Sequence, residues 1–181
     1  MGHDKGLLVS EGLTWVETLQ RELTSLPLPV YASIRADQQH LYQAWVPKDR
    51  LIVDQAWEGV AGPLIGILSA AQVISDQHLL VVPCDMPQLR REVFARWVTA
   101  FQNQAVAYQA FISQTTRRWQ PLCGIYHRDG LDKLAQYYQQ GRLQNQSMQA
   151  IVEKMLVTFA IDIPTSFASQ FTNYNTPHDL S

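Results

Sequence analysis

The stretch Leu79-Leu-Val-Val-Pro-Cys-Asp-Met-Pro87 decides the fold class of this chain. Its first four residues are all apolar, which is typical of a parallel strand covered on both faces. Pro83 ends that strand, and the carboxylate of Asp85 follows directly. In open α/β sheets ligands bind beyond the carboxyl ends of the strands, so Asp85 is suited to holding magnesium against nucleotide phosphates. It could equally cap the helix that follows Pro87.

Short apolar runs alternate with segments of helical periodicity along the rest of the chain, which predicts an α/β domain with a mostly parallel sheet. The predicted strands are Leu28–Ile34, Leu51–Val53, Leu79–Val82, Val106–Ile112, Leu122–Tyr126 and Val157–Ile161. The predicted helices are Leu13–Leu23, Pro63–Ile74, Leu89–Phe101, Leu131–Tyr138 and Met148–Leu156, the last with Ser147 as its N-cap. We therefore expect one domain over residues 1–181, with helices on both faces of a central sheet.

The composition limits the possible functions. The 181 residues carry a net charge of -2, which gives no general attraction to nucleic acid or to an anionic membrane. No apolar run is long enough to span a bilayer, and the first residues lack the apolar stretch of a signal peptide. The two cysteines, Cys84 and Cys123, are too few for a disulfide framework and suit a reducing compartment. We expect a cytoplasmic protein.

Three further candidate groups lie in the first half of the chain. Lys5 could neutralise phosphate charge, although a single lysine near a terminus is usually solvated. Asp54 follows the strand over 51–53 and could border the same sheet edge as Asp85, or it could be a turn aspartate. The segment Gly62-Pro-Leu-Ile-Gly66 opens a helix whose free N–H groups attract anions, or it is an ordinary turn before a surface helix.

Polar groups in the second half of the chain are also candidates. Arg117 and Arg118 could bind a second anionic substrate, although paired arginines in a loop are usually solvated. Asn173 and Asn175 could bind a ligand or a metal, or they could satisfy backbone groups of a turn. The five histidines have no spacing that resembles a zinc site. Each of these motifs is a weak indication of function by itself, and their order along the chain is more specific than any one of them.

Taken together and in this order, these pieces resemble the MobA-type molybdenum cofactor guanylyltransferases. The matching residues are Met1-Gly2, Asp4-Lys5-Gly6-Leu7, Asp54, Gly62 to Gly66, Pro83 to Pro87, Arg118 with Pro121-Leu122, and Phe171 to Leu180. The resemblance implies a three-layer, Rossmann-like nucleotidyltransferase fold. It also implies transfer of GMP from GTP to the phosphate of molybdenum-molybdopterin, which forms the guanine dinucleotide cofactor and releases pyrophosphate by direct in-line attack.

The resemblance implies catalytic roles for Lys5, which would contact the GTP phosphates, and for Asp85, which would bind Mg²⁺. The other implied contacts are with the nucleotide through Ser33, Asp54 and Gly62, and with molybdopterin or the metal shell through Arg118, Asn173 and Asn175. Ser33 or Ala32 stands where the family usually has an asparagine. The implied partners are GTP, molybdenum-molybdopterin, and molybdoenzymes or other proteins of cofactor biosynthesis, with no nucleic acid or membrane.

One departure concerns the start of the chain. The family begins with an apolar strand and a glycine-rich loop that cradles phosphates, and both are missing from this chain as numbered. Deleting a central strand would remove about five buried side chains at roughly 1.5–3 kcal/mol each, and would leave two unpaired edges. We therefore expect translation to start upstream of Met1.

Two other functions stay open at this point. A cytidylyltransferase of the same fold could act on the same cofactor, because the residues that choose the base belong to the missing loop. A degenerate member could bind molybdopterin or a partner protein without catalysis. The missing glycine loop favours this last reading, while the retained Lys5 and Asp85 count against it.

Overall fold

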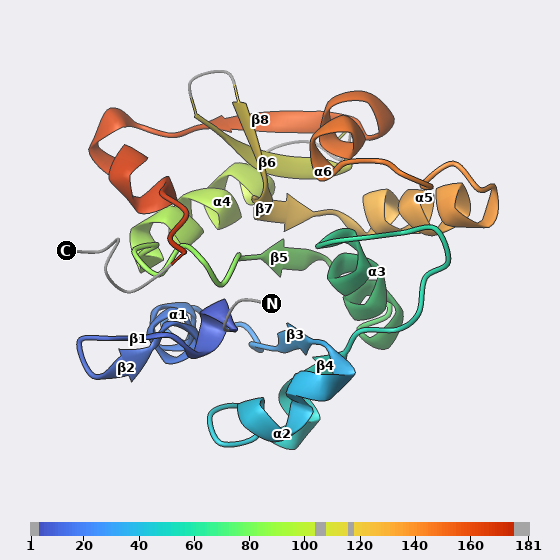
Figure 1. Cartoon of the computed structure of the whole chain (residues 1–181). Coiled ribbons are helices and arrows are strands. Elements are labelled where there is room, and N and C mark those ends of the chain that lie inside the picture. The colour runs from blue at the N-terminus through green and yellow to red at the C-terminus, as the bar shows by residue number, and fades with distance from the viewer. Residues whose placement is uncertain (1–3, 104–107, 116–117, 176–181) are drawn as a thin grey trace.

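The computed structural model describes residues 4–103, 108–115 and 118–175 (Figure 1). Its strands are β1 (Val9–Ser10), β2 (Leu13–Thr14), β3 (Ala32–Ile34), β4 (Leu51–Val53), β5 (Leu79–Val81), β6 (Ala110–Thr115), β7 (Arg118–Tyr126) and β8 (Thr158–Asp162). Its α-helices are α1 (Trp15–Leu23), α2 (Gln39–Tyr42), α3 (Leu64–Val73), α4 (Arg91–Asn103), α5 (Arg128–Gln139) and α6 (Met148–Ala150). The 3₁₀-helical segments are η1 (Lys5–Leu7), η2 (Ala36–Gln38), η3 (Lys48–Arg50) and η5 (Thr165–Phe171), and η4 (Ile151–Met155) is π-helical.

The strands form a larger sheet and two smaller ones. The larger sheet has the order β5-β7-β6-β8, with β5 and β6 antiparallel to β7 and β8 parallel to β6. It follows that β5, β6 and β8 run in one direction and only β7 runs against them. Strands β3 and β4 pair in parallel as a separate sheet, and α3 contacts β3, β4 and β5. In the larger sheet three of the four strands therefore run in one direction, as predicted, and β7 is the exception, whereas β1 and β2 form a separate antiparallel hairpin.

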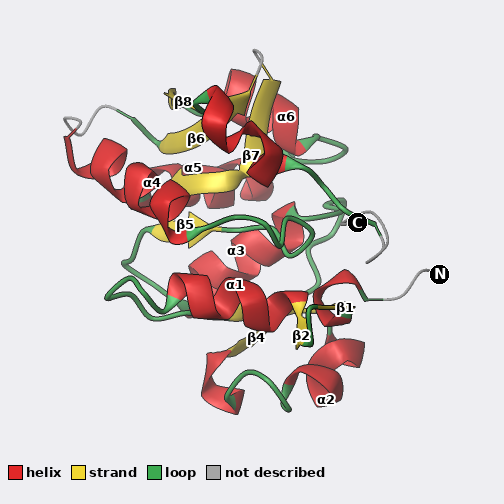
Figure 2. Cartoon of the chain, turned by 90° about the vertical axis from the view of Figure 1, so that its left-hand side faces the viewer, coloured by secondary structure: helices red, strands yellow, loops and turns green. Residues whose placement is uncertain are grey.

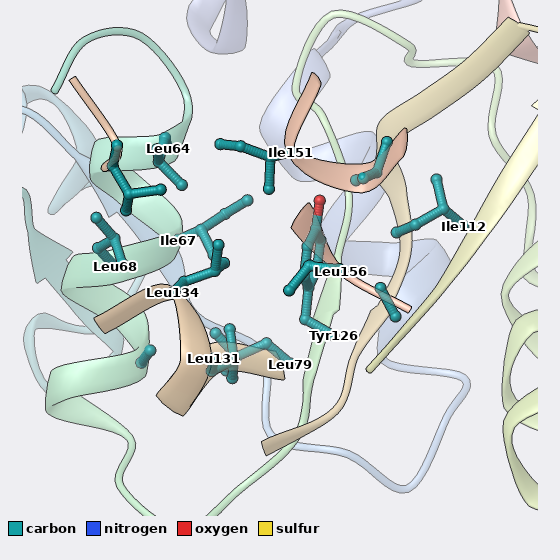
Figure 3. Close-up of a cluster of buried hydrophobic side chains, with 14 of the residues drawn as sticks. Leu64, Ile67, Leu68, Leu79, Ile112, Tyr126, Leu131, Leu134, Ile151 and Leu156 are labelled. Atoms are coloured by element: carbon teal, nitrogen blue, oxygen red, sulfur yellow. The ribbon is translucent and has the colours of Figure 1, made fainter. Parts of the chain in front are cut away.

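Helices cover both faces of the larger sheet (Figures 1 and 2). On one face, side chains from α3, α5 and the α6–η4 segment pack against β5, β6 and β7 in the cluster drawn in Figure 3. On the other face, α1, α4 and Phe171 form a second cluster against the same strands. Ala110 and Ile112 point into the first cluster and Phe111 into the second, as the two-residue period of a strand requires. The predicted three-layer arrangement is confirmed.

Strand β5 also behaves as its sequence predicts. Leu79 and Val81 pack into the first cluster, whereas Leu80 and Val82 pack into the second. A strand buried on both faces cannot carry polar side chains, so the first polar group appears only beyond its end. The first polar side chains after the strand are those of Cys84 and Asp85, and the candidate site starts there.

The N-terminal part of the predicted helix over 13–23 is a strand instead. Residues Val9 to Thr14 form the hairpin β1–β2, whose turn residues Glu11 and Gly12 have φ values of 53° and 80°. Positive φ at both central residues is the requirement of a type I′ turn. Helix α1 then begins at Trp15 with a capping box, in which Thr14 Oγ1 accepts from the N–H of Glu17 and the Glu17 carboxylate accepts from Thr14.

Other boundaries differ for local reasons. The strand predicted over 28–34 is shorter because Pro27 and Pro29 have no N–H to donate to a ladder, and Leu28 is exposed. The strand predicted over 106–112 lies at 110–115, and residues 106 and 107 are outside the described part of the chain. Ser147 caps α6 as predicted, and the predicted helix continues as the π-helical segment η4.

Within the described ranges, no helix is both long enough and apolar enough to cross a membrane.

Candidate active site

The site begins with an ion pair between residues far apart in the sequence. The Nζ of Lys5, in the turn η1, lies 3.1 Å from Oδ2 of Asp85, four residues beyond the end of β5. The two side chains remain 38% and 23% exposed, so a ligand can reach both. The structure therefore brings together the two residues for which the sequence predicted catalytic roles.

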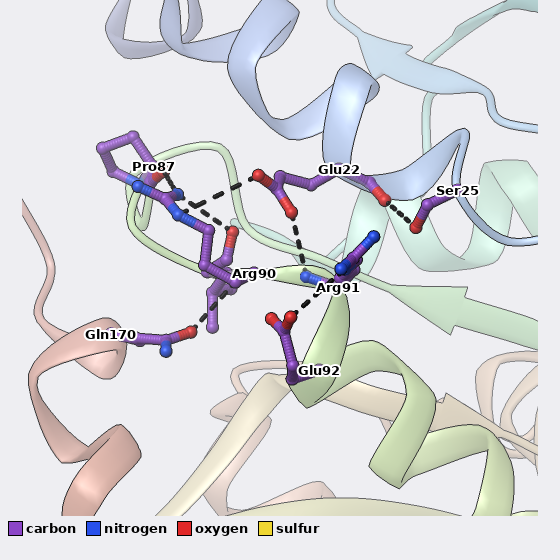
Figure 4. Close-up of polar contacts among 8 residues, drawn as sticks. Glu22, Ser25, Pro87, Arg90, Arg91, Glu92 and Gln170 are labelled. Carbon is purple, nitrogen blue, oxygen red and sulfur yellow. Dashed lines mark hydrogen bonds and ion pairs between the residues drawn. The ribbon is translucent and has the colours of Figure 1, made fainter.

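The start of α4, which follows the loop that carries Asp85, is held by contacts from two other elements (Figure 4). The N–H of Arg90 donates to Gln170 Oε1 at 3.0 Å, and the N–H of Arg91 donates to Glu22 Oε2 at 3.0 Å. The guanidinium of Arg90 donates to the carbonyl of Pro87 at 2.9 Å. The start of α4 is thus capped by Glu22 of α1 and Gln170 of η5. The alternative reading of Asp85 as the cap of this helix is wrong, and its carboxylate pairs with Lys5 instead.

The C-terminal segment lies against the same loop. The backbone N–H of Tyr174 donates to the carbonyl of Asp85 at 2.9 Å, and the ring of Tyr174 packs edge-on to Trp15 of α1. Asn173 and Asn175 flank this anchor and are exposed. Both predicted asparagines therefore lie next to the Asp85 loop, while Thr176 to Leu180 of the same motif are outside the described residues.

A second pair of predicted residues meets at the ends of β3 and β4. The hydroxyl of Ser33 donates to Asp54 Oδ1 at 2.7 Å, and the N–H of Asp54 continues the strand pairing by donating to the carbonyl of Ile34. Burial raises the pKa of Asp54, and the hydrogen bond from Ser33 offsets part of this rise. Gly66 of α3 faces the pair, because a Cβ there would lie 2.7 Å from Ser33 Oγ. The first turn of α3, Ser33 and Asp54 therefore form one packed unit.

Gly62 lies just before this unit, at the start of α3. Its φ of +68° is the left-handed conformation that glycine adopts without strain, and no atom would contact an added Cβ. Helix α3 begins at Leu64, after Pro63 in the N-cap position, and no side chain caps it. The helix thus starts at an exposed turn, and the N–H of Ile65 donates to the carbonyl of Gly62 at 3.1 Å.

Arg118 is placed by the pairing of β6 with β7. It is exposed at the amino end of β7, opposite Thr115 at the carboxyl end of β6. Because β7 runs against its neighbours, its amino end lies at the sheet edge where β5, β6 and β8 end. Arg118 thus shares an edge with the Asp85 loop, and Arg117 is outside the described residues.

Sequence reasoning missed a group around Asp4. Its carboxylate accepts hydrogen bonds from the N–H of Gly6, from Gln38 Nε2 and from the hydroxyl of Tyr42. Gln38 and Tyr42 are buried, 34 and 38 residues from Asp4. No local pattern in the sequence could pair them with Asp4, because the connection depends on how η2 and α2 fold back beside η1.

The donor set suits a magnesium ion that arrives with a nucleotide. Among the residues that the structure describes, no group of three His, Cys, Asp or Glu side chains could hold a metal alone. Mg²⁺ is commonly bound by one or two carboxylates together with substrate phosphates and water, and the partly exposed carboxylate of Asp85 meets that requirement. The pKa of the Cys84 thiol is raised to about 11 by desolvation and by the charges of Asp85 and Asp4, so the thiol is protonated at neutral pH. Mg²⁺ is a hard cation that prefers oxygen ligands to sulfur.

Comparison with solved structures supports the fold. The structure of molybdopterin-guanine dinucleotide biosynthesis protein A from Archaeoglobus fulgidus superposes with a TM-score of 0.75 at 20% identity, covering 99% of this chain and 88% of that one. The shared fold is the Rossmann-like, three-layer arrangement predicted from the sequence. The Lys5–Asp85 pair lies beyond the carboxyl end of β5, which is where ligands bind in sheets of this kind.

The sequence comparisons show the family. Residues 1–157 match the family model of the MobA-like NTP transferase domain, and the chain belongs to this family of nucleotidyltransferases. It is 27% identical over 183 residues to the probable molybdenum cofactor guanylyltransferase of Nostoc sp., covering 100% of this chain and 83% of that protein. It is 25% identical over 181 residues to the molybdenum cofactor guanylyltransferase of Vibrio atlanticus, covering 99% and 86%. The predicted membership is confirmed.

Proposed function

We propose that this chain transfers GMP from GTP to the phosphate of molybdenum-molybdopterin. The observation that carries the proposal is the 3.1 Å pair of Lys5 and Asp85, a cation and a carboxylate held together beyond the end of β5. Phosphoryl transfer needs groups that position phosphates and neutralise their charge, and this pair offers both. The names of the relatives support the choice of GTP and molybdopterin as the substrates.

In the proposed reaction, an oxygen of the molybdopterin phosphate attacks the α-phosphorus of GTP. A new P–O bond forms there while the bond to the oxygen that bridges to the β-phosphate breaks, and pyrophosphate leaves with its electrons. Lys5 exchanges its contact with Asp85 for the incoming phosphates, so its ammonium neutralises the charge that develops on the leaving group. Bound Mg²⁺ would supply further neutralisation and hold the phosphates in line.

The other predicted residues divide between the two substrates. Ser33, Asp54 and Gly62 would contact the nucleotide, because Ser33 and Asp54 are hydrogen-bonded to each other beside α3 and Gly62 lies in the turn just before that helix. Arg118, Asn173 and Asn175 would serve the molybdopterin side, since they are exposed around the same edge as Asp85. We propose the cytoplasm as the compartment, where the free cysteines Cys84 and Cys123 stay reduced.

Formation of the dinucleotide product tests the proposal directly. The chain is mixed with Mg²⁺, molybdenum-molybdopterin and equal amounts of GTP and CTP, and the dinucleotide product is identified by mass spectrometry. We expect the guanine product, at least about a hundredfold less of it with Asp85→Asn, and about ten- to hundredfold less with Lys5→Met. The matched controls are Asp49→Asn and Lys48→Met, which lie at the opposite, amino end of β4 and should keep full activity.

Two other results would replace the proposal. A cytosine product would identify a cytidylyltransferase of the same fold. Binding of molybdopterin without any product from either nucleotide would identify a non-catalytic binding protein.

A further inference from the structure

Asp4, the residue before Lys5, is held by three hydrogen bonds. Its Oδ1 accepts from the N–H of Gly6 at 3.0 Å and from the hydroxyl of Tyr42 at 2.9 Å, and its Oδ2 accepts from Gln38 Nε2 at 2.5 Å. The first bond closes the turn η1, in which Asp4 is the N-cap. The other two join that turn to the η2–α2 segment. Asp4 therefore fastens the backbone next to Lys5 to a distant part of the chain.

The two distant donors are themselves fixed. Gln38 and Tyr42 are 9% and 6% exposed. The Oε1 of Gln38 accepts from the N–H of Arg35 at 2.7 Å, so the other end of its amide, Nε2, is left to donate to Asp4. Tyr42 packs with Ile34 in a small core cluster beside β3. Both donors are thus anchored to the carboxyl end of β3.

Gly6 makes the contact with Tyr42 possible. A Cβ on residue 6 would collide with the hydroxyl of Tyr42, and Gly6 is buried. Because glycine lacks that atom, the phenol reaches past the turn to Asp4. The three residues of the Asp4-Lys5-Gly6 motif therefore have separate tasks: an anchor, a cation and the space for the anchor's partner.

We propose that Asp4 is a positioning residue that, through Gln38 and Tyr42, fixes the η1 turn so that the Lys5 ammonium stays beside Asp85. Asp4 touches no substrate and acts only through Lys5. The identity of the ligand, a nucleoside triphosphate whose phosphates Lys5 meets, rests on the proposed function. The fixed position of Lys5 is a property of the chain without any ligand, and can be measured separately.

The first experiment needs no nucleotide. The full chain is treated with a limiting amount of acetic anhydride, and the acetylation rate of each lysine is followed by mass spectrometry. We expect Lys5 to react more slowly than Lys48, because its ammonium pairs with Asp85. Asp4→Asn should speed acetylation of Lys5 by about three- to tenfold, since asparagine places an NH₂ group against one of the donors, and Tyr42→Phe should do so by a smaller factor. Asp49→Asn and Tyr137→Phe are matched controls and should leave the Lys5 rate unchanged.

The second experiment measures GTP affinity by calorimetry in a double-mutant cycle. Tyr42→Phe and Asp4→Asn should each weaken binding by about three- to tenfold, as expected for lost hydrogen bonds. In a Lys5→Met background both changes should have almost no further effect, because the side chain through which Asp4 acts is gone. A merely structural role would instead weaken binding equally in both backgrounds.

The outcomes separate this inference from the proposed function. An unchanged Lys5 acetylation rate in folded Asp4→Asn and Tyr42→Phe proteins overturns the positioning role, whatever the nucleotide results. Full additivity in the double-mutant cycle also overturns it. If acetylation responds as expected but the wild-type chain binds no GTP, then the positioning stands and the proposed function fails. Should Asp4→Asn not fold, the conservative Tyr42→Phe variant decides both experiments.

Discussion

The hydroxyl of Ser33 and the carboxylate of Asp54 are joined by a 2.7 Å hydrogen bond between the ends of two parallel strands, β3 and β4. Helix α3 approaches this pair so closely that a Cβ on Gly66 would lie 2.7 Å from Ser33 Oγ and 3.6 Å from Asp54 Oδ1. The missing side chain at residue 66 therefore makes the hydrogen bond compatible with the packing of the helix. We therefore expect stability at this corner to depend on the three residues together.

Gly66→Ala tests that dependence. In a helix interior, alanine is favoured over glycine by up to about 1 kcal/mol. Here the added methyl pushes the Ser33 hydroxyl away from Asp54, so the gain in the free energy of unfolding should be lost or reversed. In a Ser33→Ala background the same change should stabilise the chain, because the closest atom is gone. Urea denaturation of the four proteins measures both effects, and equal effects in the two backgrounds would rule out the coupling.

Asp54→Asn should make the chain more stable at neutral pH. Burial raises the pKa of Asp54, so the folded state binds its proton more tightly than the unfolded state does, and this group makes the fold less stable as the pH rises through that range. Asparagine removes the cost and can still accept from Ser33. The melting temperature of the variant should exceed that of the wild type near pH 7, and the difference should shrink in acid. A difference in melting temperature that grows in acid would mean that folding lowers the pKa of Asp54 instead of raising it.

Tyr174 should matter through its ring rather than its hydroxyl. The ring is buried against Trp15, and the adjoining backbone N–H holds the carbonyl of Asp85. Tyr174→Ala should cost about 3 kcal/mol of stability. It should also lower the transfer rate, because the segment around residue 174 would hold the Asp85 loop less firmly. Tyr174→Phe keeps the ring and should change neither property by much. Equal losses in both variants, measured by denaturation and by turnover, would assign the effect to the hydroxyl instead.

His78 should make the fold sensitive to acid. Its ring lies 4.3 Å from that of His127, and its Nδ1 accepts from the N–H of Arg128. Burial first, and then the charge of His127, lower the pKa of His78 from its ordinary 6.5. The unfolded state therefore takes up the proton at a higher pH than the folded state, and stability is lost as the pH falls below about 6.5.

His78→Asn is the variant for this prediction, since its side-chain oxygen can replace Nδ1 as an acceptor without titrating. The melting temperature of the wild type should fall more between about pH 7.5 and about pH 5.5 than that of the variant. Parallel pH curves for the two proteins would show that His78 does not contribute.

The sequence predicted the layers of this fold well, for a physical reason. Strand β5 is apolar at every position, and α4 carries Val93, Trp97 and Phe101 on one face, in line with Leu89 just before it. The hydrophobic pattern alone therefore predicted which surfaces face the core. The direction of β7 was not predictable in this way. Its reversal depends on the hairpin with β6, whereas a strand covered on both faces reads the same in either direction.

Of the candidate site, only the residues that belong to short sequence motifs could be predicted. Lys5 and Asp85 were found because they belong to short motifs in a recognisable order, and the structure brings them together. Gln38 and Tyr42 were not predicted as part of the site, because neither residue belongs to a motif that indicates a function. Their contact with Asp4 exists only once η2 and α2 fold back beside η1.

The most direct test of the Lys5–Asp85 site is the magnesium dependence of GTP binding, measured by calorimetry with and without Mg²⁺. The wild-type chain should bind GTP more tightly when Mg²⁺ is present. Asp85→Asn should remove that gain, because the carboxylate that would hold the ion is gone, and Lys5→Met should weaken binding by about tenfold or more under both conditions. A full response to Mg²⁺ in Asp85→Asn, or wild-type affinity in Lys5→Met, would contradict the account.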